Sequence, residues 1–219
     1  LIEELLVFLV EKLVPEKKLT QEQFPRLTYQ EAMEKYNSDK PDLRSQMSNV
    51  DSQMLSFVWV IDFPLLEYSK TEKKLVSTHH PFTHPKEEDI EKLDSDPKSV
   101  RARAYDIVLN GFEIGGGSIR IHKSDLQEKM FRVLGLGKKE VEEQFGHLLK
   151  AFRHGAPPHG GIALGLDRLF AILLGEPNIR EVIAFPKTGD GRDLLMNAPS
   201  EASKEQLKEL GIEIKKKKD

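Results

Sequence analysis

Apolar residues recur with a helical period in several stretches of the chain. The first stretch covers residues 1–14, and Pro15 ends it. Thr28 and Glu31 have the spacing of a capping box, which predicts a short second helix that runs to about Tyr36. The same period predicts further helices at residues 124–134, 138–153, 165–174 and 200–210.

Strand patterns alternate with these helices. A continuous β-branched and aromatic run predicts a buried strand at residues 57–61, and residues 105–122 have the strongest β character. Shorter strands are predicted at 162–165 and 181–185. We therefore predict an α+β domain whose antiparallel sheet contains the 105–122 hairpin and the 162–165 strand, backed by the helix that follows.

The remaining segments are predicted to be irregular. Residues 45–56 are polar and without a period, which indicates a linker or a trimmed loop. Residues 86–103 are charged and predict a surface loop with one short helix, and residues 215–218 predict a solvated tail.

Composition limits the possible functions. In 219 residues, 33 basic and 36 acidic side chains give 33 − 36 = −3, which excludes a wholly basic nucleic-acid-binding surface. The absence of cysteine excludes disulfides, thiolate metal sites and a cysteine nucleophile. The longest apolar run near the start is far too short to span a bilayer, so we expect a soluble, cytoplasmic chain of one domain with no membrane partner. Because Leu1 already lies inside a helical pattern, we expect a longer gene product.

Two carboxylates are predicted to converge on the hairpin. Asn110-Gly111 is the preferred pair for a two-residue type I′ turn, which places Val108 opposite Glu113 and leaves Asp106 diagonally across from it on one face. Two acids on an otherwise apolar strand repel each other unless a cation lies between them, and Mg²⁺ with phosphate ligands fits. The alternative is a solvated pair on the wet side of the sheet.

A run of three glycines, Gly115 to Gly117, follows this acidic pair. Glycine costs stability in a strand, which is understandable where a ligand or another backbone comes close. Strict alternation from Glu113 places Arg120 on the other face, so Arg120 joins the carboxylates only if the glycine run contributes a one-residue bulge. A wide turn and an exposed strand arginine are the alternatives.

Arg168 lies in the first turn of a predicted helix, where a cation opposes the helix dipole. A bound phosphate at the helix start would make this position favourable. An ion pair with the adjacent Asp167 explains it equally well.

The histidines do not have the spacing of a zinc site. His79 and His80 are adjacent, and no thiolate is available to complete a site. We predict that these two line a polar pocket, with ordinary surface histidines as the alternative.

Several of these stretches also resemble a known family. HHPFT at 79–83, YDIVLNGFEIGGGSIRIH at 105–122 and GAPPHGGIALGLDRL at 155–169 resemble the aspartyl-tRNA synthetases, most closely the bacterial type. The similarity extends to FPRLTYQEAMEKY and SDKPDLR within 24–44, WVIDFPLLEY at 59–68 and IREVIAFPKT at 179–188. It implies a class II synthetase antiparallel sheet flanked by helices.

The resemblance also implies roles for particular residues. Glu113 and Arg168 would be catalytic, and Asp106 with Glu113 would bind Mg²⁺. The residues implied in ATP binding are Glu113, Gly165, Leu166, Asp167 and Arg168. Those implied in aspartate binding are His79, His80, Ser118 and Arg120.

Under this resemblance, residues 1–219 are the C-terminal portion of a catalytic domain. Nothing in them resembles the anticodon-binding barrel or the first and second class II motifs, and residues 45–56 stand where an inserted domain usually lies. The implied partners are ATP, L-aspartate and tRNA(Asp), with tRNA(Asn) left open. A homodimer is implied for the complete protein, which would bury apolar surface near residues 1–13. The alternatives are a non-catalytic fragment that binds nucleotide, tRNA or a protein, and a structural fragment stable only within its dimer.

Overall fold

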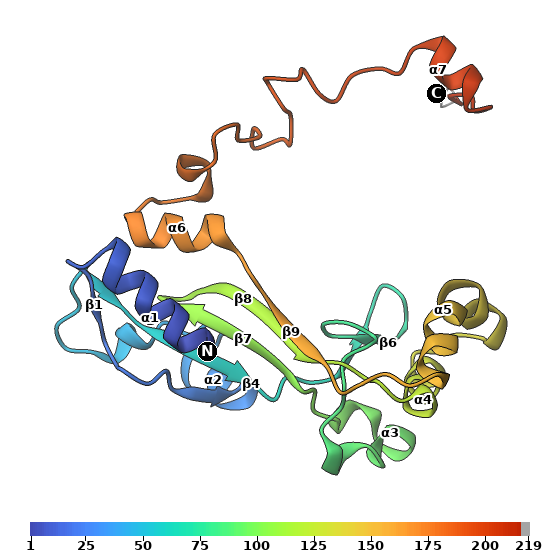
Figure 1. The fold of residues 1–219 in the computed structure, drawn as a ribbon, viewed down its shortest axis with the longest axis horizontal. Coiled ribbons are helices and arrows are strands. Elements are labelled where there is room, and N and C mark those ends of the chain that lie inside the picture. The colour runs from blue at the N-terminus through green and yellow to red at the C-terminus, as the bar shows by residue number, and fades with distance from the viewer. Residues whose placement is uncertain (216–219) are drawn as a thin grey trace. The chain divides into compact units, whose positions relative to one another are not determined.

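The computed structural model describes residues 1–215 and divides into two compact units, Leu1–Leu169 and Phe170–Asp219 (Figure 1). Apart from Lys215, the tail predicted at 215–218 lies outside the described residues. In the described part of the chain, no helix is both long and apolar enough to cross a membrane.

The first unit is built on a five-stranded sheet in the order β2-β4-β7-β8-β9. The strands are β2 Arg26–Thr28, β4 Phe57–Ile61, β7 Ala104–Leu109, β8 Phe112–Ile119 and β9 Gly160–Leu164. From β4 to β9 every neighbouring pair is antiparallel, whereas β2 pairs with β4 in parallel. The predicted α+β class is therefore confirmed, with one unpredicted parallel strand at the edge.

The predicted helices are present with small shifts at their ends. They are α1 Ile2–Leu13, α2 Tyr29–Tyr36, α4 Ser124–Val133, α5 Lys138–Arg153, α6 Leu166–Leu174 and, in the second unit, α7 Lys204–Glu209. The Thr28 side chain accepts a hydrogen bond from the Glu31 backbone N–H, and the Glu31 carboxylate accepts one from Thr28 N–H, which completes the predicted capping box.

Side chains alternate between the two faces of the sheet. One face buries Val58, Val60 and Val108 in a core that also includes residues of α2 and α4. Phe57 lies on the opposite face and stacks on Phe24 with ring centroids 4.5 Å apart. Helix α1 lies along the sheet (Figure 1), and Glu3 on α1 accepts a hydrogen bond from the Trp59 indole of β4.

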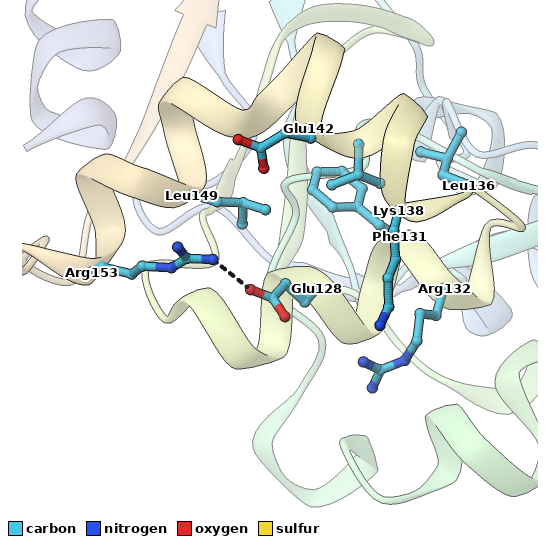
Figure 2. Close-up of a pocket in the computed structure, with 9 residues that line it drawn as sticks. Glu128, Phe131, Arg132, Leu136, Lys138, Glu142, Leu149 and Arg153 are labelled. Carbon is cyan, nitrogen blue, oxygen red and sulfur yellow. Dashed lines mark hydrogen bonds and ion pairs between the residues drawn. The ribbon is translucent and has the colours of Figure 1, made fainter.

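Helices α4 and α5 form a pair held by aromatic packing. Phe131 of α4 stacks on Phe145 of α5 with ring centroids 4.8 Å apart. A cavity of about 260 Å³ remains between the two helices, and Figure 2 shows Arg153 reaching toward Glu128 at its edge. The apolar side chains that line it are Phe131, Leu136, Val141 and Leu149.

Two segments predicted to be irregular are more ordered than expected. Within 45–56, β3 Met54–Leu55 pairs in parallel with β1 Lys18–Leu19. The apolar Leu55 side chain is fully buried at this pairing. Residues 86–103 contain α3 Lys92–Ser95 and two 3-10 turns, Glu87–Asp89 and Pro97–Ser99. Asp89, Leu93 and Val100 are fully buried, so this segment is not simply a surface loop. The hairpin of β5 Leu66–Ser69 and β6 Lys74–Ser77 was not predicted.

The prediction of a strand at 181–185 is wrong. In the second unit a 3-10 helix, Ile179–Val182, occupies the first half of that stretch, and Asn178 Oδ1 caps it by accepting from Arg180 N–H. Phe185 is exposed. A strand needs a neighbouring strand to satisfy its backbone groups, and residues 170–215 contain none.

Candidate functional site

The β7–β8 hairpin places the predicted acids as the turn chemistry requires. Asn110 and Gly111 both have positive φ, at 52° and 85°, and Val108 pairs with Glu113. The next pair is Ile107 with Gly115, so Ile114 is an extra residue in β8. This bulge directly precedes the glycine run in which the sequence analysis required one.

The bulge changes which side chains of β8 share a face. Glu113 now lies on the face of Gly116, Ser118 and Arg120, and Gly116 pairs with Asp106 of β7. A side chain on Gly116 would collide with a carboxylate oxygen of Asp106 and come within 3.6 Å of Glu113 Oε1. The two carboxylates therefore converge on the space that this glycine leaves open.

The acids have basic neighbours. Lys40 Nζ lies 3.6 Å from Glu113 Oε2, and His79 Nε2 lies 3.8 Å from Asp106 Oδ2. Lys40 lies between α2 and the 3-10 helix Leu43–Gln46, and only the tertiary fold brings it to the hairpin. Asp106 is buried, while Glu113 is partly exposed. Two carboxylates that line one open cavity suit a divalent ion such as Mg²⁺, which keeps several positions for water and phosphate oxygens.

The other two glycines of the run allow close approach of the neighbouring strand. A side chain on Gly115 would come within 2.8 Å of the Ala163 carbonyl oxygen of β9, and one on Gly117 would collide with the Gly161 carbonyl. The expectation that glycine stands where another backbone comes close is confirmed at these positions.

Arg120 follows β8 and keeps an unpaired donor in the cavity. Its backbone N–H donates to the His159 carbonyl at 2.9 Å, which fixes the main chain. Its Nη1 atom is buried and has no hydrogen-bond partner among residues 1–215. A buried guanidinium nitrogen without a partner costs free energy, so this position favours a ligand that brings a carboxylate.

The two adjacent histidines line the same cavity. His79 packs edge-on against Phe63 with ring centroids 4.7 Å apart. His80 Nδ1 accepts a hydrogen bond from Phe82 N–H at 3.2 Å. Burial and, second, the nearby charge of Arg120 lower the pKa of His80 below its ordinary value, which favours the neutral ring. Among residues 1–215, no group of three or more histidine, cysteine or acidic side chains could by itself hold a metal ion.

Arg168 reaches back from the start of α6 to the hairpin. Its Nη1 donates to the backbone carbonyl of Glu113 at 2.5 Å. Within residues 1–215 the Arg168 guanidinium contacts this carbonyl and forms no ion pair with Asp167, so the local pair considered from the sequence is not formed. The guanidinium instead lies next to the carboxylate-bearing turn of β8.

These side chains line one cavity of about 460 Å³. Eight of the ten residues singled out from the sequence take part: His79, His80, Asp106, Glu113, Ser118, Arg120, Gly165 and Arg168. Leu166 and Asp167 are exposed and do not line it. Sequence reasoning missed the contribution of Ala163 on β9, which carries no chemical signal of its own. The cavity between α4 and α5 (Figure 2) contains none of the predicted residues.

Comparison with known proteins places the chain in a family. Residues 1–189 match the family described as tRNA synthetases class II (D, K and N). The chain is 57% identical over 173 residues to an aspartate–tRNA ligase of Staphylococcus carnosus (strain TM300), and 58% identical over 173 residues to an aspartate–tRNA(Asp/Asn) ligase of Thermoanaerobacter sp. (strain X514). Each match covers 79% of this chain and 29% of the relative. The chain therefore matches less than a third of the length of these curated relatives.

Solved structures agree at the level of the fold. The aspartyl tRNA synthetase from Entamoeba histolytica superposes with a TM-score of 0.61 at 24% identity, over 88% of this chain and 40% of that one. An asparaginyl-tRNA synthetase of the same organism, in complex with asparaginyl-adenylate, gives a TM-score of 0.55 at 21% identity, over 88% of this chain and 42% of that one.

Proposed function

The chain belongs to the class II tRNA synthetases of the D, K and N group, and from that premise we propose that it carries the aspartate and ATP pocket of an aspartate–tRNA ligase. The reaction is the ATP-dependent formation of aspartyl adenylate, followed by transfer of aspartate to the 3′ end of tRNA. The cavity bounded by β7, β8, β9 and the start of α6 is the proposed site.

The observation that carries this proposal is the separation of charge within one cavity. Arg120 offers a buried donor without a partner at one place, and Asp106 and Glu113 present two carboxylates at Gly116. Aspartate needs a cationic partner for its side chain, whereas ATP arrives with a metal that needs carboxylates. A site for only one of these ligands would not need both features.

Each proposed role follows from where a side chain lies. Arg120 holds the side-chain carboxylate of aspartate, with Ser118, His79 and His80 as neighbours in the cavity. Arg168 holds Glu113 in place through its backbone carbonyl, so the Glu113 carboxylate, with Lys40 beside it, can face the cavity. Arg168 and the backbone near Gly165 lie where nucleotide phosphates would meet a helix start.

The activation of aspartate by ATP needs no nucleophile from the protein. The α-carboxylate of aspartate attacks the α-phosphorus of ATP, the bond to the β-phosphate breaks, and pyrophosphate leaves. Arg168 would stabilise the added negative charge, and Arg120 would hold the nucleophile in line. Mg²⁺, held by Asp106 and Glu113 when bound, would supply charge neutralisation on the phosphates.

The activity of the whole protein is a wider proposal, because the chain matches only 29% of the length of its relatives. Those relatives are named both as aspartate–tRNA ligases and as aspartate–tRNA(Asp/Asn) ligases, so tRNA(Asp) is the proposed substrate and tRNA(Asn) stays open. A homodimer and a cytoplasmic location, where ATP and tRNA are found, belong to the same proposal.

ATP–pyrophosphate exchange tests the proposal directly. The complete protein should incorporate labelled pyrophosphate into ATP only when L-aspartate is present, and asparagine should not replace it. Exchange that does not depend on aspartate, or no exchange by the complete protein, would reject the activity and favour a non-catalytic fragment that binds nucleotide, tRNA or a partner.

A further inference from the structure

A tight turn at residues 80–83 presents the histidines to the cavity. Thr83 N–H donates to the His80 carbonyl at 3.0 Å, which closes a four-residue turn with Pro81 and Phe82 at its centre. The Phe82 carbonyl accepts from Ile121 N–H at 2.9 Å, next to Arg120. The turn is thereby joined to the end of β8.

The peptide bond between Pro81 and Phe82 is held at both of its polar atoms. Its carbonyl oxygen accepts a hydrogen bond from Gln127 Nε2 at 3.0 Å. Its N–H donates to the ring Nδ1 of His80 at 3.2 Å. Gln127 lies on α4 and is fully buried, so its amide faces the turn and not solvent.

This peptide can in principle take two orientations. Type I and type II turns differ mainly in the rotation of the central peptide, and type II requires positive φ at the third residue. Phe82 is not among the described residues with positive φ, which agrees with a type I arrangement. Rotation of the peptide would break the contacts to Gln127 and to His80 together.

The ring of His80 is therefore coupled to a buried amide on α4. When Nδ1 accepts from a backbone N–H, the proton of a neutral imidazole lies on Nε2. We propose that Gln127 is a positioning residue for the cavity, and that it fixes the tautomer and orientation of His80 through the Pro81–Phe82 peptide. The link to aspartate use rests on the proposed function, whereas the effect on the ring does not.

Aromatic packing of Phe82 is an alternative explanation for how the turn at 80–83 is held in place. Phe82 packs edge-on against Phe131 and Phe145, with ring centroids 6.2 and 5.5 Å apart. Phe131 is four residues after Gln127 on the same side of α4. If this aromatic packing alone held the turn, the loss of the Gln127 amide would leave His80 unchanged. Gln127→Met separates the two, because it keeps the side-chain length and apolar stem and removes the donor together with an amide oxygen that has no hydrogen-bond partner within the described residues.

The first experiment observes the ring without relying on activity. In the 219-residue chain labelled with ¹⁵N-histidine, long-range ¹⁵N–¹H correlations distinguish the two tautomers, and His80→Gln assigns the signal. We expect the Nε2–H form in the wild type and a substantial Nδ1–H population in Gln127→Met. Gln144→Met, the same change at an exposed position on α5, should leave the tautomer unchanged.

Several outcomes would overturn the proposal. One is an Nδ1–H ring in the wild type, which needs no variant and so decides even if Gln127→Met does not fold. Another is an unchanged tautomer in a folded Gln127→Met. Gln127→Leu gives a second route, since leucine suits the buried position, has no donor for the Pro81 carbonyl and should release the ring as well.

The second experiment measures the consequence for the substrate. In the complete protein, Gln127→Met should raise KM for aspartate about tenfold, the lower end of what lost supporting contacts cost at metal-binding histidines, and leave KM for ATP unchanged. Equal changes in both constants, or no change, would reject the positioning role. If the wild type shows no aspartate-dependent exchange, the proposed function fails, and the tautomer measurement still decides the coupling of Gln127 to His80.

Discussion

The carboxylates of Asp106 and Glu113 approach each other across the position where Gly116 has no side chain. The Ile114 bulge produces this relationship, because it moves Glu113 onto the face of Gly116. Lys40 and His79 each lie near one of the two acids, and neither bridges both. The pair is therefore suited to share a divalent ion brought in with a nucleotide.

Neutralising one acid should uncouple ATP binding from Mg²⁺. Calorimetry on the complete protein measures ATP affinity with and without Mg²⁺. The factor by which Mg²⁺ raises this affinity should fall about tenfold or more in Glu113→Gln, which keeps the shape and removes the charge. Asp106→Asn should act in the same direction but more mildly. Glu67→Gln, on exposed β5, is the control. Wild-type Mg²⁺ dependence in both variants would make the acids a solvated sheet face.

Filling the space between the acids should have a similar effect without removing any charge. In Gly116→Ala the new methyl group collides with Asp106, which must rotate away from Glu113. We expect weaker Mg²⁺-dependent ATP binding. Thermal unfolding should change little, because the methyl group meets side-chain atoms of Asp106 that can rotate, and not backbone, and because alanine restricts the unfolded chain. Gly137→Ala, where the methyl group meets open space, is the matched control. Unchanged ATP binding in Gly116→Ala would contradict this geometry.

The sequence predicted most of the sheet and helices because their signals are local. The Asn110-Gly111 turn fixes its own register, and the Thr28 capping box is complete within four residues. The position of Arg120 was predicted only conditionally, because a bulge at Ile114 leaves no mark in the alternation of side chains. Lys40 and Gln127 could not be found from the sequence, since each reaches its partner only through the tertiary fold.

The segment at 86–103 shows that the sequence also does not reveal which charged residues are buried. Its charges indicated a solvated loop, yet Asp89 is fully buried and accepts hydrogen bonds from Arg101 Nε at 2.7 Å and Lys92 Nζ at 2.6 Å. Charge composition cannot distinguish a solvated acid from one buried with its partners.

Asp89→Asn should therefore destabilise the first unit. The loss should be about 1.5–3 kcal/mol, the value of hydrogen bonds to a charged group, with the partial exposure of Arg101 favouring the lower end. Thermal and urea unfolding measure it. Asp94→Asn removes an exposed partner of Lys129 and should cost less than about 1 kcal/mol. Equal losses in the two variants would mean that burial of Asp89 adds nothing.

The ion pair of Asp89 with Arg101 also predicts how stability depends on pH. The hydrogen bonds from Arg101 hold the pKa of Asp89 far below its ordinary value. A lowered folded-state pKa means that the contribution is complete above the ordinary carboxyl pKa near 4 and is lost as pH falls below it. Wild type should thus lose more stability than Asp89→Asn between about pH 4 and pH 2. Parallel curves would contradict this assignment.

Helix α1 presents apolar residues to solvent as well as to the core. Leu1, Leu5 and Phe8 are exposed and recur at helical spacing, while Leu6 and Val10 are buried. We expect the complete protein to cover this stripe in the proposed homodimer. Phe8→Glu should shift the complete protein toward monomer in sedimentation, and Val50→Glu, at another exposed apolar position, should not. A dimer unaffected by Phe8→Glu would place the interface elsewhere.

Selection of the amino acid is assigned to Arg120, whose buried Nη1 has no partner within the described residues. A planar guanidinium can donate two parallel hydrogen bonds to the side-chain carboxylate of aspartate, whereas lysine offers a single point charge. Arg120→Lys weakens one partner of a desolvated pair. It should therefore lower kcat/KM for aspartate by a factor equivalent to about 2–5 kcal/mol and leave ATP binding largely unchanged. Arg103→Lys provides the same substitution at a residue outside the cavity. An aspartate dependence that is unchanged in Arg120→Lys would remove this residue from the pocket, and equal losses for aspartate and ATP would indicate damage to the fold and not to recognition.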